Sequence, residues 1–99
     1  HLDELILAVP KDHPLARRKS VRLADALAYD FVGAHPGSAI NNLLTTAASA
    51  VGLPLRLRIQ VTSFDALCLM VHAGLGIGVL PRKSASLYHG TLAIRAVRL

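Results

Sequence analysis

Short apolar runs alternate with helix-forming segments along the whole chain, and this order constrains the fold more than any other feature of the sequence. Residues 5–9 form a continuous apolar run that Pro10 stops, a pattern typical of a strand covered on both faces. Further strands are predicted at residues 31–33, 55–61, 76–80 and 92–97, and helices at 23–27, 38–51, 64–73 and 81–88. This alternation predicts an α/β sandwich with a largely parallel sheet.

The segment 38–51 has the strongest helical pattern. Ser38 is a suitable N-cap, Gly52 fits the left-handed position after the last turn, and Pro54 prevents continuation. Apolar side chains at helical spacing predict the buried face: Ile40, Leu43, Leu44, Ala47, Ala48 and Val51. The polar face is predicted to hold Asn41, Asn42, Thr45, Thr46 and Ser49.

The segment 64–73 is predicted to be a second capped helix. Ser63 is its N-cap, Asp65 suits the positive end of the helix dipole, and Gly74 ends it. Its core side is predicted to hold Leu67, Met70, Val71 and Gly74. Asp65, Cys68 and His72 share another side, which we interpret as a surface or interface face rather than a metal or redox site.

Length and composition indicate one packed domain. The chain has 99 residues, 53% of them hydrophobic and 17% charged, so disorder is excluded. Residues 11–21 hold the basic triplet 17–19 and are predicted to form an exposed loop. The first residue is His1 rather than Met and residues 92–99 still resemble a strand, so we expect a piece of a longer protein.

A cytoplasmic location without membrane contact is expected. No apolar run approaches the roughly 20 residues that span a bilayer, and residues 1–4 lack the basic start of a signal peptide. The single cysteine, Cys68, cannot form an internal disulfide.

The formal net charge of +5 suggests a nucleic-acid partner, but the distribution of the cations does not support one. The cations lie in the loop 17–19, on the strand face at Arg56 and Arg58, and near the end at Arg95 and Arg98. No helix gathers them, and the four aromatic residues form no visible stacking platform. We therefore expect the charge to be dispersed over the surface.

No catalytic, cofactor or metal site is predicted. The glycines at 74, 76 and 78 leave a helix to enter a strand, the reverse of a dinucleotide-binding turn, so we interpret them as a tight connection in which backbones approach closely. The motif G-x-S-x-G is absent, and the five histidines (His1, His13, His35, His72 and His89) are scattered without metal-ligand spacing.

Two helix N-termini follow predicted strands, at residues 35–38 and 61–64. Each turn offers unpaired backbone N–H groups and hydroxyls at the carboxyl end of a strand, where ligands of open α/β sheets bind. Capping by Ser38 and Ser63 is the alternative for either turn alone. Together, the two turns favour a small-molecule cleft.

The order of motifs resembles the second subdomain of the effector-binding domain of LysR-type transcriptional regulators. The similar stretches are 3–10 (DELILAVP), 12–16 (DHPLA), 23–27 (LADAL), 31–33 (FVG), the turn 37–38, 61–63 (VTS) and 67–81 ending in GLGIGVLP. They cover nearly the whole chain. His72 and Gly78 stand where alanine is more usual in the family.

The resemblance implies a three-layer α/β sandwich, specifically one lobe of the periplasmic-binding-protein type II kind, spanning residues 1–99. Strands near 5–9 and 92–97 would cross between this lobe and a first one. A small anionic or aromatic effector would bind between the lobes, at the positions that match here: Gly37, Ser38, Thr62, Ser63 and Phe64. The parent protein would be a dimer or tetramer that binds DNA through a helix-turn-helix outside this chain, without enzymatic activity or cofactor.

Three other functions stay open at this point. A lobe of a periplasmic solute-binding protein has the same fold, and the residues upstream would distinguish it by a signal peptide in place of a helix-turn-helix. A small α/β enzyme would need an acid–base pair in the cleft, and none is apparent. Direct DNA binding would show strong salt dependence.

Overall fold

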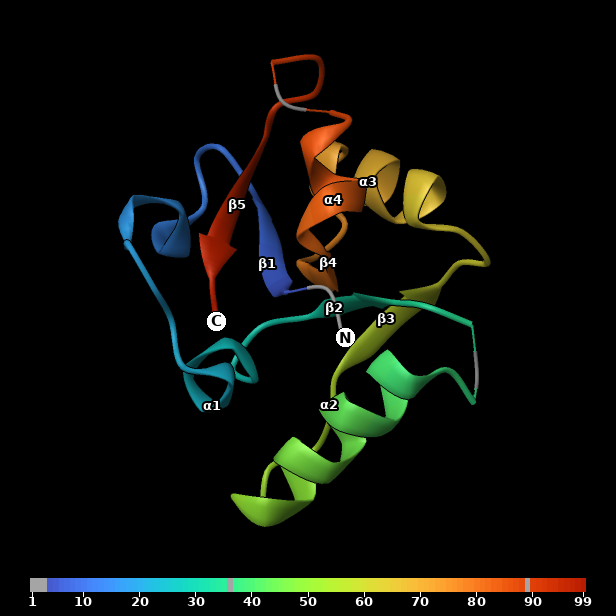
Figure 1. Cartoon of the computed structure of the whole chain (residues 1–99). Helices are drawn as coiled ribbons and strands as arrows, with labels where there is room; N and C mark the ends of the chain where they lie inside the picture. The colour runs from blue at the N-terminus through green and yellow to red at the C-terminus, as the bar shows by residue number, and fades with distance from the viewer. Residues whose placement is uncertain (1–3, 36, 89) are drawn as a thin grey trace.

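Strands and helices alternate in the computed structural model, which describes residues 4–35, 37–88 and 90–99 (Figure 1). The elements are β1 (Leu5–Pro10), the 3-10 helix η1 (Pro14–Arg17), α1 (Leu23–Ala26), β2 (Phe31–Gly33), α2 (Ala39–Ala50), β3 (Leu57–Gln60), α3 (Phe64–His72), β4 (Gly78–Pro81), α4 (Arg82–Ser86) and β5 (Ile94–Arg98). In these ranges no helix is long and apolar enough to cross a membrane. The predictions that concern His1 and His89, and Pro36 in the turn 35–38, lie outside the described residues.

Strand β1 lies at the centre of a three-stranded sheet. It pairs antiparallel with β4, where Leu7 faces Val79, and with β5, where Leu7 faces Val97. Strands β2 and β3 pair in parallel. A parallel bridge between Phe31 and Ile77 joins the two sheets, with Val32 donating to the carbonyl of Ile77 at 2.8 Å. The resulting order is β5-β1-β4-β2-β3, and only β1 runs against the others, so a largely parallel sheet is confirmed.

Helices cover both faces of this sheet and make three layers. Leu7 and Val9 of β1 pack with η1, α1 and α2, while Ile6 and Ala8 pack with α3 and α4. All four side chains are buried, as the uninterrupted apolar run predicts. The predicted three-layer α/β sandwich is therefore confirmed.

The prediction of an exposed loop at residues 11–21 is confirmed for the basic triplet 17–19, which is exposed, but it is wrong for three other residues of the segment. Leu15 and Ala16 are buried in the 3-10 helix η1, and Val21 is buried after it. His13 begins η1, because its Nδ1 accepts the N–H of Leu15 at 3.1 Å. The segment covers the β1–β5 end of the sheet, which no long helix reaches on that side.

Several predicted boundaries shift by one or two residues. Strand β3 begins at Leu57 rather than residue 55, β4 begins at Gly78 rather than residue 76, and β5 covers Ile94–Arg98 rather than 92–97. Helix α3 ends at His72, and α4 ends at Ser86 with Pro81 as its N-cap.

The buried face of α2 differs from the predicted one. Leu44 and Ala48 are buried, but Leu43 and Val51 are 41% and 48% exposed, and Asn41 is only 7% exposed. Strands β2 and β3 have 3 and 4 residues, whereas α2 has 12. So short a piece of sheet covers only a narrow strip of the helix, and the outer apolar side chains stay in contact with solvent.

The three glycines that lead from α3 into β4 allow close backbone packing, as predicted. Gly74 ends α3 with a φ of 82°. A Cβ at Gly76 would lie 2.9 Å from the carbonyl oxygen of Asp30, and one at Gly78 would lie 2.7 Å from Cδ2 of Leu67. This connection brings Ile77 beside β2 and so joins the two parts of the sheet.

We expect Gly76→Ala to lower the free energy of unfolding by about 1–3 kcal/mol, because the added Cβ meets rigid backbone rather than a movable side chain. Gly74→Ala is the control, since its φ of 82° is also positive but no atom lies within 4 Å of the added Cβ. Urea unfolding of both variants measures the difference. Equal losses would contradict the role of Gly76 in close packing.

Candidate functional site

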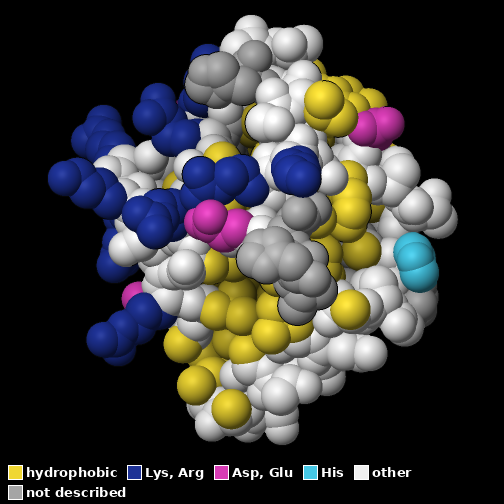
Figure 2. Space-filling view, in the orientation of Figure 1, with side chains coloured by type: hydrophobic (Ala, Val, Ile, Leu, Met, Phe, Trp, Pro, Cys, Tyr) yellow, Lys and Arg dark blue, Asp and Glu magenta, His cyan; other side chains and the backbone are white. Residues whose placement is uncertain are grey.

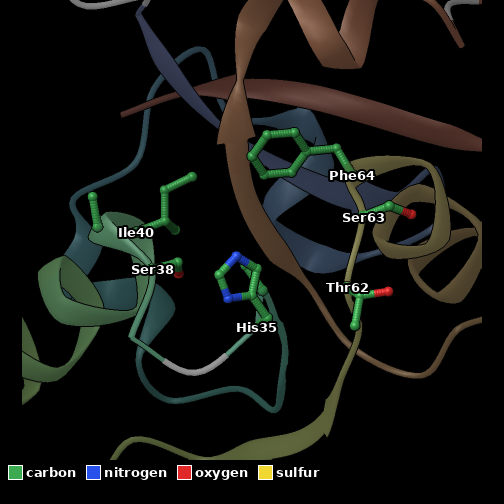
Figure 3. Close-up of a pocket in the computed structure, with 8 residues that line it drawn as sticks. His35, Ser38, Ile40, Thr62, Ser63 and Phe64 are labelled. Atoms are coloured by element: carbon green, nitrogen blue, oxygen red, sulfur yellow. The ribbon is translucent and has the colours of Figure 1, made fainter.

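A pocket of about 290 Å³ lies beyond the carboxyl ends of β2 and β3, between the N-termini of α2 and α3 (Figure 3). The residues that line it are Ala34, His35, Ser38, Ala39, Ile40, Thr62, Ser63 and Phe64. Four of the five sequence-predicted site residues are thus brought together. Gly37, the fifth, is not among the lining residues; its φ of 81° turns the chain from β2 toward α2.

Both serines cap their helices and keep a hydrogen-bond donor. The Oγ of Ser38 accepts the N–H of Asn41 at 3.1 Å, and the Oγ of Ser63 accepts the N–H of Ala66 at 3.0 Å. An accepting hydroxyl can still donate its own proton to another group. The first turn of each helix also presents N–H groups that have no acceptor within the helix. The pocket is therefore rich in donors and carries the positive end of two helix dipoles.

The remaining walls are mostly apolar. In Figure 3 the side chains of Ile40 and Phe64 border the space between the two helix N-termini, with the imidazole of His35 between them. The hydroxyls of Thr62 and Ser63 turn toward α3 in the same view. No Lys, Arg, Asp or Glu occurs among the described lining residues. Such a site suits a small ligand with a hydrogen-bond-accepting end and an apolar body.

Asn41 holds one wall of the pocket in place. Its Nδ2 donates to the carbonyl oxygens of Ala34 at 2.9 Å and of His35 at 3.4 Å, which ties the end of β2 to α2. Its Oδ1 is buried and has no partner among the described residues. The predicted place of Asn41 on the exposed polar face is therefore wrong, because these inward hydrogen bonds turn that side chain toward the sheet.

Sequence reasoning missed His35, Ala34, Ala39 and Ile40 as pocket residues. The sequence did contain a signal for Ala34 and His35, since both directly follow β2, a strand of a parallel pair, and ligands bind at the carboxyl ends of such strands. Ile40 was assigned to the core by its periodicity, but it is half-buried and borders the pocket. A helical period identifies the face of a residue and not which end of the helix adjoins a cavity.

On the side of α3 that holds Asp65, Cys68 and His72, the two end residues Asp65 and His72 are exposed, as predicted for a surface face, and only Cys68 is buried. Cys68 is fully buried, so its predicted surface or interface position is wrong, and Gly74, predicted on the core side, is exposed. The hydroxyl of Tyr88 donates to Asp65, and Nδ1 of His72 accepts the N–H of Ala93 at 2.8 Å. These bonds fasten the segment between α4 and β5 onto α3. In the described part of the chain, no three His, Cys, Asp or Glu side chains form a group that could hold a metal ion.

Comparisons with known proteins agree on one family. The sequence profile described as the LysR substrate binding domain matches residues 2–99. An uncharacterized HTH-type transcriptional regulator of Methanocaldococcus jannaschii is 30% identical over 89 residues, which cover 84% of this chain and 30% of that protein. The chain therefore spans less than a third of the length of this curated relative.

Solved structures agree on the fold. The effector binding domain of QuiR in complex with shikimate has a TM-score of 0.83 and 23% identity, covering 98% of this chain and 45% of that one. The BenM effector binding domain with its effector benzoate has a TM-score of 0.78 and 24% identity, with the same two coverages of 98% and 45%. This chain therefore has the fold of a little under half of each domain.

Asn41→Ala is expected to lower the free energy of unfolding by about 1–3 kcal/mol, because the part-buried hydrogen bonds from its amide to the carbonyls of Ala34 and His35 are lost. Asn42→Ala, an exposed neighbour in the same helix, is the control and should change it by less than about 0.5 kcal/mol. Chemical denaturation measures both. Faster amide hydrogen exchange at residues 34–35 in the first variant alone would locate the loss at the pocket wall.

The Cys68 thiol is expected to be unreactive in the folded chain. Burial, with a smaller contribution from the Asp65 carboxylate, raises its pKa to about 11, so the reactive thiolate is scarce at every pH below that value. Mass spectrometry after iodoacetamide treatment at pH 8 should find no alkylation without urea and complete alkylation in urea. Rapid alkylation of the folded chain would contradict the burial of the thiol.

Proposed function

Because this chain belongs to the LysR substrate-binding domain family, we propose that it is one effector-sensing lobe of a LysR-type transcriptional regulator. The effector would bind between this lobe and another, and DNA would be bound through a helix-turn-helix outside this chain. The whole regulator would act as a dimer or tetramer without enzymatic activity. A transporter lobe of the same fold is the alternative, and the relation to HTH-type transcriptional regulators favours the regulator.

The observation that carries the proposal is the pocket between the N-termini of α2 and α3. Shikimate and benzoate, the ligands of the two similar domains, are both small carboxylates on a six-membered ring. A carboxylate suits a site of N–H and O–H donors at two positive helix ends. We therefore propose a small ring carboxylate as the effector class.

The proposed roles follow the chemistry of the walls. The hydroxyl proton of Ser38 and the first-turn N–H groups would hold the carboxylate. Gly37 would shape the turn before α2, and Ser63 would hold the first turn of α3 in place through its cap. The hydroxyl of Thr62 would add a donor after rotation about its Cα–Cβ bond. The ring of Phe64 would contact the ring of the effector.

A response requires a difference in affinity between two arrangements of the lobes. An effector that bridges both lobes binds the closed arrangement more tightly and shifts the population toward it. In this chain the start of β1 lies beside the end of β5, since Ile6 faces Arg98. We propose that the chain enters and leaves this lobe along these strands, so that closure bends the connections near them.

We expect Ala39→Glu to weaken the binding of benzoate and shikimate without unfolding the chain. Ala39 is the first residue of α2, is exposed and lines the pocket. A glutamate in the first turn stabilises the helix by its favourable interaction with the helix dipole. It also puts a negative charge where the carboxylate of the ligand would bind. Titrations followed by two-dimensional proton–nitrogen NMR should show saturable shifts at the amides of Ala39, Ile40 and Phe64 in the unmodified chain. In the variant, the dissociation constants obtained from these shifts should rise by about tenfold or more, since placing like charges side by side costs several kcal/mol.

The matched control is Ala24→Glu, which adds the same charge to the first turn of α1, away from the pocket. It should bind both compounds like the unmodified chain. Two results would reject the proposed site: equal weakening in both variants, or saturable shifts confined to residues outside the pocket.

A further inference from the structure

His35 is the only titratable side chain among the described residues that line the pocket. Its imidazole lies between the N-termini of α2 and α3, with Ile40 on the α2 side and Phe64 on the α3 side (Figure 3). The pocket holds about 290 Å³, so a carboxylate bound in it stays near this ring. Opposite charges within about 4–6 Å stabilise each other's charged forms. The protonation of His35 is therefore coupled to the charge of whatever binds between the two helices.

Hydrogen bonds to α2 fix the backbone that carries this imidazole. The carbonyl oxygen of His35 accepts the N–H of Ser38 at 3.3 Å and Nδ2 of Asn41 at 3.4 Å. The same amide donates to the carbonyl of Ala34 at 2.9 Å. Because the end of β2 is tied to α2 in this way, the imidazole is presented at one place in the pocket wall.

The described elements around the pocket bring no other full charge into its lining. Helix α2 has no charged residue within Ala39–Ala50, and Arg58 of β3 does not line the pocket. Asp65 of α3 also lies outside the lining, and its carboxylate accepts the hydroxyl of Tyr88. Burial raises the pKa of the Cys68 thiol in α3 to about 11, so that group is neutral. The charge of the described lining is therefore the charge of His35.

Lysines and arginines gather on another side of the molecule. In Figure 2 they lie mainly over the side that holds η1 and β5, away from the carboxyl ends of β2 and β3. The expectation that the charge is dispersed is therefore wrong for this face. Since no Lys or Arg is among the described lining residues of the pocket, His35 is the group there that can supply a full positive charge.

We propose that the imidazolium of His35 pairs with the carboxylate of the effector, so that effector binding strengthens as the pH falls. This inference rests on the proposed function, because it assigns a charged partner to the carboxylate in the same pocket. Histidine gains its proton between about pH 8 and pH 5, whereas carboxylates stay ionised there because they titrate near about pH 4. A fall in pH over this range therefore adds charge to the protein and leaves the ligand unchanged.

The two protonation states of His35 favour different ligands. With a neutral imidazole, the pocket offers N–H and O–H donors and helix dipoles, which also suit the oxygen of an uncharged amide. The imidazolium adds a charge-assisted hydrogen bond, which is strongest to an anion. Falling pH should therefore raise the affinity for a carboxylate more than the affinity for an amide of the same shape.

The test compares benzoate with benzamide, its uncharged analogue, by two-dimensional proton–nitrogen NMR of the 99-residue chain at pH 5.5 and pH 8. The dissociation constant of benzoate should be about fivefold to tenfold lower at pH 5.5, because hydrogen bonds to charged groups contribute more than those between neutral groups. The dissociation constant of benzamide should change by less than about twofold, since an amide has no charge to pair with the imidazolium.

Matched histidine variants locate the effect. His35→Asn should bind benzoate with the same dissociation constant at both pH values, because asparagine gains no charge. His72→Asn is the control and should keep the pH dependence of the unmodified chain. His72 is exposed outside the pocket, and the asparagine oxygen can accept the N–H of Ala93 in place of Nδ1.

His35→Lys provides an independent arm. The lysine ammonium keeps its charge at pH 8, so this variant should bind benzoate severalfold more tightly than the unmodified chain does at that pH. Far-UV circular dichroism at both pH values checks that each variant is folded.

Three outcomes would overturn this inference and leave the proposed function standing, because benzoate still binds in each of them. They are equal benzoate constants at the two pH values, a pH dependence that survives in His35→Asn, and an equal gain in affinity for benzamide. Failure of the proposed function has a different signature, since benzoate would then give no saturable shifts at either pH. That result would reject the effector pocket and the role of His35 together.

Discussion

The pairing of β1 with both β4 and β5 is the constraint on which the rest of the structure depends. Strand β1 is covered on both faces and paired with a strand along both edges, so its buried backbone is provided with partners on both sides. Because β1 alone runs in the opposite direction, β2, β3, β4 and β5 all end at one edge of the sheet. The pocket, Arg82 and the end of β5 thereby come to the same edge, although the chain reaches them at residues from 34 to 98.

The pocket depends in turn on the way α2 is held against β2. A helix above so short a sheet gains little from apolar burial, as the exposure of Leu43 and Val51 shows. The amide of Asn41 supplies a directional contact instead, since it donates to two carbonyls directly after β2. One polar side chain therefore fixes the N-terminus of α2 relative to the strand end. The unpartnered Oδ1 of the same residue is the cost of this arrangement within the described structure.

The sequence was sufficient for the order of elements, the three layers and the two capped helix N-termini. These depend on local signals, such as the apolar run of β1 and the hydroxyls of Ser38 and Ser63. What could not be predicted depends on contacts between distant segments. The burial of Asn41 requires carbonyls of another element, and Cys68 is buried because α3 faces both the sheet and the segment after α4.

The physics of the pocket determines the kind of ligand that suits it. The described lining residues provide N–H and O–H donors and helix dipoles, whose effect fades within about one helical turn and therefore selects a small group held at a fixed place. Because no lining residue among those described carries a full charge while the imidazole of His35 is neutral, ligand binding in that state of the pocket is expected to depend on shape and only weakly on salt.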